Sequence, residues 1–135
     1  MDVQPYLNFG GRFDEAMAFY GKVLGASVTF LMRFKDTPQG DHPTAPEWAD
    51  KVMHANVTIG NNQIMASDGM MGEAPAFAGF SMSVSGVPKA EGERIFQALA
   101  EGGQVTVPFQ KTFWAEGFGM VTDRFGLMWM VNCEQ

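Results

Sequence analysis

The sequence predicts an α+β fold made of two βαβββ modules. The order of elements is the first reason: a half-exposed strand, an amphipathic helix and three further strands occur in the first half of the chain and again in the second. The second is a short echo, in which Phe19-(x5)-Gly25-(x2)-Val28-Thr29 returns as Phe96-(x5)-Gly102-(x2)-Val105-Thr106. Because 135 residues suit one domain, we expect a single domain over residues 1–135, with modules at about 1–68 and 79–135.

The first module begins with a strand over residues 3–9 and a helix over residues 12–24. Alternation along the strand places Gln4, Tyr6 and Asn8 on one face. The helix is predicted by apolar residues at helical spacing, namely Phe13, Met17, Tyr20 and Leu24. Glycine tolerates the left-handed backbone that ends many helices, so Gly25 is a natural C-cap.

Three more strands complete this module, over residues 27–34, 51–59 and 64–67. The middle one alternates sharply, with Met53, Ala55, Val57 and Ile59 opposed to His54, Asn56 and Thr58. A proline-rich loop over residues 35–50 precedes it; this loop contains His42 and a short helical turn near Trp48. A tight hairpin turn over residues 60–63 follows it, and a second loop spans residues 68–78.

The second module repeats this order. It has a strand over residues 79–85, in which Phe80, Met82 and Val84 oppose small polar residues, and a helix over 89–101. A strand over residues 104–109 precedes a final hairpin, whose turn is Thr122-Asp123-Arg124-Phe125-Gly126. Its flanks have strand composition and hold two of the three tryptophans.

The final hairpin also carries an aromatic group, Phe113, Trp114 and Phe118, beside Gly117 and Gly119. Glycine in a strand often marks a bulge or the close approach of another group. Two interpretations stay open: a terminal hairpin of the core, or one wall of a ligand cleft in which the glycines leave backbone space.

Composition excludes several classes of function. The net charge of −6 argues against nonspecific binding of nucleic acid through phosphates. No apolar run reaches membrane-spanning length, and the first residues carry no basic and apolar signal pattern. The single cysteine, Cys133, is expected to be an inert thiol in a reducing compartment, and we therefore expect a cytoplasmic protein.

Specific motifs along nearly the whole chain resemble the PhnB-like branch of the glyoxalase/bleomycin-resistance (vicinal-oxygen-chelate) superfamily. They are Pro5-Tyr6-Leu7-Asn8-Phe9-Gly10-Gly11, Ala18-Phe19-Tyr20, Leu24-Gly25-Ala26, Met53-His54-Ala55-Asn56-Val57, Met65-Ala66-Ser67-Asp68 and the final hairpin. The resemblance implies that the two modules form a curved mixed sheet around a cleft, with the helices outside. The apolar strand faces would then cover the helices, and the polar faces would line the cleft.

The same resemblance places divalent-metal ligands on the first and last strands of each module. The corresponding positions here are Gln4, Ala66 (or Met65, one residue away), Gly79 and Met130. Of these only Gln4 could bind a metal, whereas a catalytic metal site needs about three protein ligands. We therefore expect no metal and no other cofactor. There is also no phosphate-binding loop, Rossmann signature or methyl-donor-binding pattern.

Two functions remain open. The first is a protein that binds a small molecule in the cleft without a catalytic metal, using Gln4, Tyr6, Asn56, Ser81, Trp114 and Phe118. The second is an enzyme of the same superfamily, a lyase, dioxygenase or other, with His54 as acid/base or with an atypical metal site. The simpler alternative is that these polar residues only face water on a one-sided sheet, and that Asp68 caps its loop.

The resemblance also implies a homodimer. The loops over residues 35–50 and 69–78 are long enough to cover a neighbour, and they carry Trp48, Met70, Met71 and Phe77. Large apolar side chains favour burial by roughly 1.5–3 kcal/mol each. We therefore expect a dimer interface to bury some of them.

Overall fold

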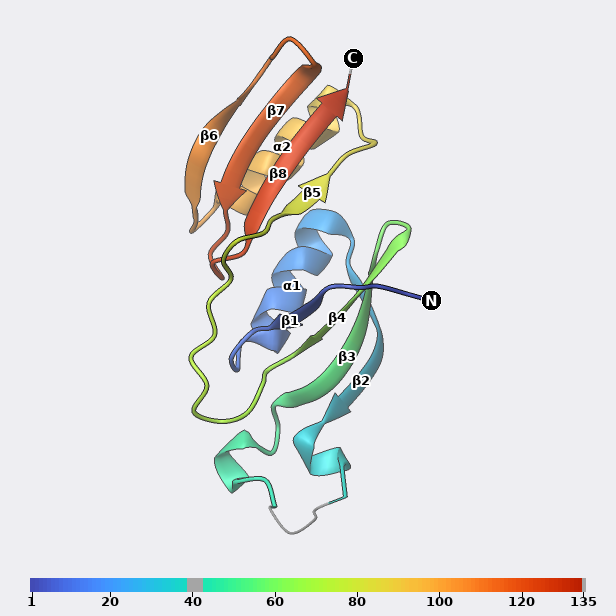
Figure 1. Cartoon of the computed structure of the whole chain (residues 1–135), viewed down its shortest axis with the longest axis vertical. Helices are drawn as coiled ribbons and strands as arrows, with labels where there is room; N and C mark the ends of the chain where they lie inside the picture. The colour runs from blue at the N-terminus through green and yellow to red at the C-terminus, as the bar shows by residue number, and fades with distance from the viewer. Residues whose placement is uncertain (39–42, 135) are drawn as a thin grey trace. The chain divides into compact units, whose positions relative to one another are not determined.

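The computed structural model describes residues 1–38 and 43–134, and it divides into two compact units, Met1–Pro75 and Ala76–Gln135 (Figure 1). The first unit contains β1 (Tyr6–Asn8), α1 (Phe13–Leu24), β2 (Ser27–Arg33), β3 (Val52–Ile59) and β4 (Asn62–Ser67). The second contains β5 (Met82–Val84), α2 (Lys89–Ala100), β6 (Gln104–Gln110), β7 (Ala115–Thr122) and β8 (Met128–Glu134). The predicted α+β class and both βαβββ modules are confirmed.

The two units share one sheet topology. The strand order is β1-β4-β3-β2 in the first sheet and β5-β8-β7-β6 in the second. In each, the first strand of the module runs parallel to the last, while the other neighbours are antiparallel. The same order in both halves confirms the internal repeat.

Helix α1 covers one face of the first sheet. Its apolar stripe buries Phe13, Met17 and Tyr20, as the helical spacing predicts, whereas at its end Val23 is buried and the predicted Leu24 is only half-buried. The sheet contributes the other half of this core: Leu7, Val52, Ala55, Val57, Ile64 and Ala66 are all buried. The helix ends where predicted, because Gly25 adopts a left-handed φ of 70° and donates its N–H to the carbonyl of Gly21.

The residues of β3 that pack on the helix do not all follow the simple alternation predicted from the sequence. Met53 is half-buried, and its neighbour Val52 is fully buried instead. The cause is a β-bulge, since the register shifts between Met32, which pairs with His54, and Arg33, which pairs with Val52. His54 and Asn56 lie beyond the bulge and keep the expected alternation.

The first strand of each module is shorter than predicted. The sequence indicates strands over residues 3–9 and 79–85, whereas β1 covers Tyr6–Asn8 and β5 covers Met82–Val84. Val3 is almost fully exposed, whereas Leu7 and Phe9 on the same predicted face are buried, so the alternation corresponds to burial only in the later part of the predicted strand. The loop over residues 35–50 has the predicted helical turn as a 3₁₀ turn, Pro46–Trp48, and a further one, Phe34–Asp36, follows β2.

In the second unit, α2 packs Ile95, Phe96 and Leu99 against β7 and β8, which bury Val121 and Val131. The bare backbone of β7 belongs to this core. A Cβ at Gly117 would collide with the ring of Phe109, and one at Gly119 would lie 2.7 Å from the ring of Phe96. The space beside these glycines is therefore filled by the buried ring of Phe96 and the partly buried ring of Phe109, and the interpretation that it is left free for a ligand is wrong. No helix of residues 1–38 and 43–134 has the length and apolar character needed to cross a membrane.

Candidate functional site

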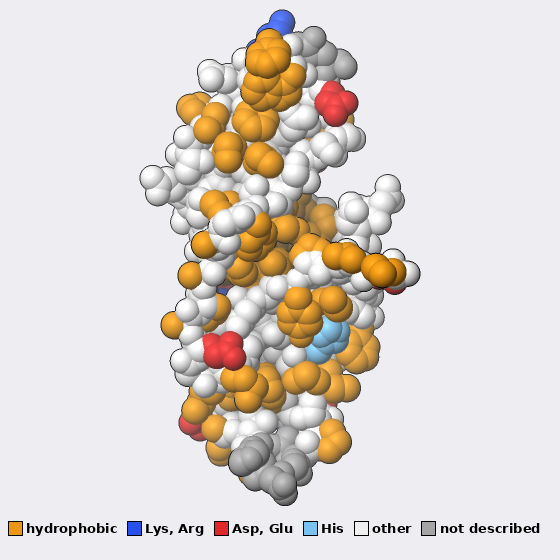
Figure 2. All heavy atoms as spheres, in the orientation of Figure 1, with side chains coloured by type: hydrophobic (Ala, Val, Ile, Leu, Met, Phe, Trp, Pro, Cys, Tyr) orange, Lys and Arg blue, Asp and Glu red, His pale blue; other side chains and the backbone are white. Residues whose placement is uncertain are grey.

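The first sheet leaves one face uncovered by α1, and the strand register shows which residues share it. Tyr6 of β1 pairs with Met65 of β4, Met65 pairs with Asn56 of β3, and Asn56 pairs with Phe30 of β2. These four residues form a row across the whole sheet, and each is at least partly exposed. We call this surface the open face of the first sheet. Figure 2 shows a histidine side chain among hydrophobic side chains on the exposed surface of this unit.

His54 lies at the centre of a hydrogen-bonded cluster on this face. Its Nδ1 is 2.9 Å from the hydroxyl of Tyr6, and its Nε2 is 3.2 Å from Oδ1 of Asn56. The ring of Phe30 lies 6.0 Å from the imidazole, centroid to centroid, and that of Tyr6 lies 5.5 Å from it. The cluster therefore combines polar groups with aromatic surface, and all four residues come from three different strands.

Gln4 lies one row further along the same surface. Its Oε1 accepts a hydrogen bond from Nε2 of Gln63 at 3.2 Å, and Gln63 pairs with Thr58 in the sheet. The first unit thus brings Gln4, Tyr6, His54 and Asn56 to neighbouring rows of one face. Period-two alternation was the signal for this arrangement. Phe30 of β2 is a further member of this face, which its pairing with Asn56 places there and which the polar pattern of the strands did not indicate.

The second unit has an aromatic cluster of its own on β7, β8 and the preceding turn. Trp114 donates its indole N–H to Oδ1 of Asn132 at 3.1 Å. Its ring meets Phe113 at 4.8 Å and Phe118 at 5.3 Å, both edge to face, and Phe113 is 92% exposed. Asn132 was missed, although an amide between buried Val131 and Cys133 signals an opposite, polar face.

Ser81 precedes β5 rather than lying within it, and Ser83 is the serine whose position pairs with Met130. Ser81 is half-buried. It belongs to the second unit, as do Trp114 and Phe118. The ligand-binding role of these three residues, and their convergence with the cluster around His54 on one pocket, stay predictions. His42 lies outside the described residues.

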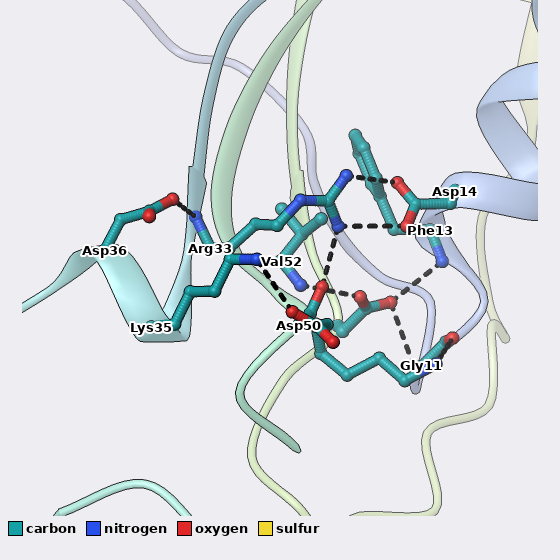
Figure 3. Close-up of polar contacts among 10 residues, drawn as sticks. Gly11, Phe13, Asp14, Arg33, Lys35, Asp36, Asp50 and Val52 are labelled. Atoms are coloured by element: carbon teal, nitrogen blue, oxygen red, sulfur yellow. Dashed lines mark hydrogen bonds and ion pairs between the residues drawn. The ribbon is translucent and has the colours of Figure 1, made fainter. Parts of the chain in front are cut away.

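Asp68 has a structural role, and Cys133 has the environment of an unreactive thiol. Oδ1 of buried Asp68 accepts the N–H groups of Gly11 and Phe13, and Oδ2 accepts that of Val52; Figure 3 shows these three backbones converging. Cys133 is buried, and this burial raises the pKa of its thiol, which disfavours the reactive thiolate.

The donor set for a divalent metal does not fit. Ala66 is fully buried on the helix side, so Met65 is the residue that β4 presents on the open face. Neither of them, nor Gly79 or Met130, carries an oxygen or nitrogen ligand in its side chain. Among residues 1–38 and 43–134, no three His, Cys, Asp or Glu side chains are grouped so that they could hold an ion.

Two βαβββ modules, each with one sheet face left open by its helix, are the fold of the glyoxalase/bleomycin-resistance/dioxygenase proteins. The chain belongs to the PhnB-like family whose model is described as 3-demethylubiquinone-9 3-methyltransferase and matches residues 1–132. The predicted family is confirmed.

Three similar proteins cover almost the whole chain. Protein YjdN of Escherichia coli (strain K12) is 37% identical over 139 residues, which is 98% of this chain and 95% of YjdN. The crystal structure of protein PA1353 from Pseudomonas aeruginosa is 44% identical, with a TM-score of 0.87 over 100% of this chain and 98% of that one. A putative 3-demethylubiquinone-9 3-methyltransferase, PhnB protein, from Bacillus cereus is 22% identical, with a TM-score of 0.81 over 98% and 99% of the chains, and it shows the fold alone.

Proposed function

We propose that this protein binds a small molecule on the open face of its first sheet, without a catalytic metal. The observation that carries the proposal is the cluster in which Tyr6 and Asn56 hold the two nitrogens of His54, beside the ring of Phe30. Sites for small molecules combine apolar and aromatic surface with a few convergent polar groups.

The cluster favours a small polar ligand with a planar or apolar portion. The rings of Tyr6 and Phe30 provide surface for stacking, worth about 0.5–1.5 kcal/mol per aromatic pair beyond the area buried. Gln4 extends the polar edge of the site toward Gln63. In the second unit, we propose Trp114, Phe118 and Ser81 as ligand-contacting residues, because Trp114 is held in place by Asn132 while remaining half exposed.

A screen of small fragments by protein NMR tests the proposal. We expect fragments that pair a polar group with a planar ring to shift the backbone signals of β1 and β3 around Tyr6 and His54. The matched control is Tyr6→Leu combined with His54→Leu, which keeps apolar surface but removes both polar groups. Fragment binding that is unchanged in this variant, or confined to the helix side of the sheet, would refute the proposed site.

An enzyme with His54 as acid/base is the second candidate, favoured by the 2.9 Å contact between the imidazole and a phenolic hydroxyl. His54→Asn separates the two functions. If His54 only supports binding, the variant should bind a fragment hit more weakly by about 0.5–1.5 kcal/mol. If His54 is a base, turnover of that compound should fall about a hundredfold or more while binding persists. The methyl transfer named for the family is not part of either proposal, since the chain carries no methyl-donor-binding pattern.

A further inference from the structure

Both ring nitrogens of His54 are already engaged within the protein. Nε2 faces the amide oxygen of Asn56 at 3.2 Å, and Nδ1 faces the hydroxyl of Tyr6 at 2.9 Å. An amide oxygen can only accept a hydrogen bond, so Nε2 must carry the proton of the neutral imidazole. Nδ1 is then an acceptor, and the hydroxyl of Tyr6 donates to it.

This arrangement decides which group remains for a ligand. The imidazole has no nitrogen left over, whereas the Tyr6 side chain is 50% exposed. A hydroxyl has one proton and two lone pairs. Since the proton of Tyr6 is committed to His54, its oxygen can meet a ligand only as an acceptor.

We infer that the Tyr6 hydroxyl is the polar group that contacts the ligand, and that the ligand presents a hydrogen-bond donor, a hydroxyl or an amine, beside its planar portion. His54 and Asn56 are positioning residues that fix the direction of the Tyr6 hydroxyl. The inference rests on the proposed binding function and names the chemical class that the site takes.

The first experiment records the ¹⁵N spectrum of the imidazole ring at pH 8. The chain has two histidines, so a His42→Gln variant leaves the signals of His54 alone. We expect Nε2 to be protonated and Nδ1 to show the shift of a hydrogen-bonded acceptor, which should move in Tyr6→Phe. A proton on Nδ1, or the averaged signals of a freely exchanging imidazole, would overturn the inference.

The second experiment compares phenol with anisole, two planar probes that differ in one hydrogen-bond donor. At pH 8, phenol should bind the open face roughly threefold to tenfold more tightly, the range expected for one ordinary hydrogen bond. Tyr6→Phe should remove this preference. The matched control, Tyr20→Phe, makes the same chemical change on the buried helix side and should keep it.

The outcomes separate the inference from the proposed function. Equal binding of phenol and anisole to the native protein would overturn the inference alone. Binding of neither probe at the open face would overturn the proposed function and, with it, the inference. A preference for phenol at pH 8 that Tyr6→Phe removes and Tyr20→Phe keeps would support both.

Discussion

Asp68 caps the helix that begins at Phe13. Its Oδ1 accepts the N–H of Phe13 at 2.8 Å, and the residue at the helix N-cap, Arg12, makes no capping bond with its own side chain. The first N–H groups of a helix need such acceptors. Here the end of β4 supplies the acceptor, and the same carboxylate also accepts the N–H of Val52 in β3. One buried side chain therefore fixes α1 against two strands of its sheet.

Asp68→Asn should destabilise the protein by about 1.5–3 kcal/mol. An amide offers one acceptor oxygen where the carboxylate offers two, so it leaves a buried N–H unsatisfied and turns its own NH₂ toward a donor. Urea denaturation followed by circular dichroism measures the change. Asp2→Asn is the control, because Asp2 is exposed at the N-terminus, and a surface change of this kind should stay within about 0.5 kcal/mol. An equally small effect at Asp68 would contradict the capping role.

The pKa of Asp50 should lie below the ordinary carboxylate range and should rise in Lys35→Met. The ammonium of Lys35 is 2.9 Å from Oδ1 of Asp50, and this hydrogen bond lowers the pKa (Figure 3). A depressed pKa contributes stability above the unfolded value, and the contribution is lost as the pH falls through the folded value. Carboxyl ¹³C NMR during an acid titration measures the pKa of Asp50 in the native protein and in Lys35→Met. Glu91 is the internal control, since Arg94 lowers its pKa independently and Lys35→Met should leave it unchanged.

Protein purified without a metal-affinity tag should contain no stoichiometric zinc, nickel or iron. The family resemblance places the metal ligands at Gln4, Met65 or Ala66, Gly79 and Met130, and of these only Gln4 has a side chain that could bind an ion, a lone amide that is a poor ligand. Elemental analysis by mass spectrometry tests this expectation. One equivalent of metal that disappears in Gln4→Ala would show that the family site is assembled with other ligands.

The protein should be a homodimer at micromolar concentration. Met70 and Met71 follow β4 and are 62% and 48% exposed in the single chain, while Trp48 is partly buried and donates its indole N–H to Gly69. We therefore expect Met70 and Met71, rather than Trp48, to be covered by the partner. Light scattering measures the mass, and Met70→Lys with Met71→Lys should shift it toward the monomer. A monomeric native protein would contradict the prediction.

Side-chain alternation predicts the candidate site well only where strands are regular. It places His54 and Asn56 on one face of their strand and Gln4 and Tyr6 on one face of theirs, because a period of two depends on each strand alone. The pairing of both strands with β4 then brings these two faces together. The bulge that buries Val52 in place of Met53 depends on the pairing with β2, which the residues of β3 do not encode. The ring of Phe109 beneath Gly117 is a contact between two strands and a helix. Gly117 indicated the close approach of another group, but only the folded structure identifies that group as the ring of Phe109.

The two helices contain a matched pair of glycines that should respond oppositely to alanine. In α1, a Cβ on Gly21 would meet only the carbonyl oxygen of Ala26, at 3.4 Å, an ordinary contact. In α2, a Cβ on Gly92 would collide with Sγ of Cys133 and lie 3.4 Å from Val131. Gly21→Ala should therefore stabilise the protein by about 0.5–1 kcal/mol through helix propensity. Gly92→Ala should destabilise it by about 1–3 kcal/mol through overpacking.

Urea denaturation of both variants gives the comparison, and Cys133→Ala shows whether the thiol is the cause. If the sulfur atom of Cys133 causes the overpacking, Gly92→Ala should destabilise the protein far less in the Cys133→Ala background. A double-mutant cycle should then give a clear favourable coupling free energy between the two sites. Gly21→Ala should behave the same way in either background, because Gly21 lies in the other unit. A Gly92→Ala variant as stable as the native protein would show that β8 yields to the added methyl group, and that the close packing of α2 on Cys133 does not require glycine.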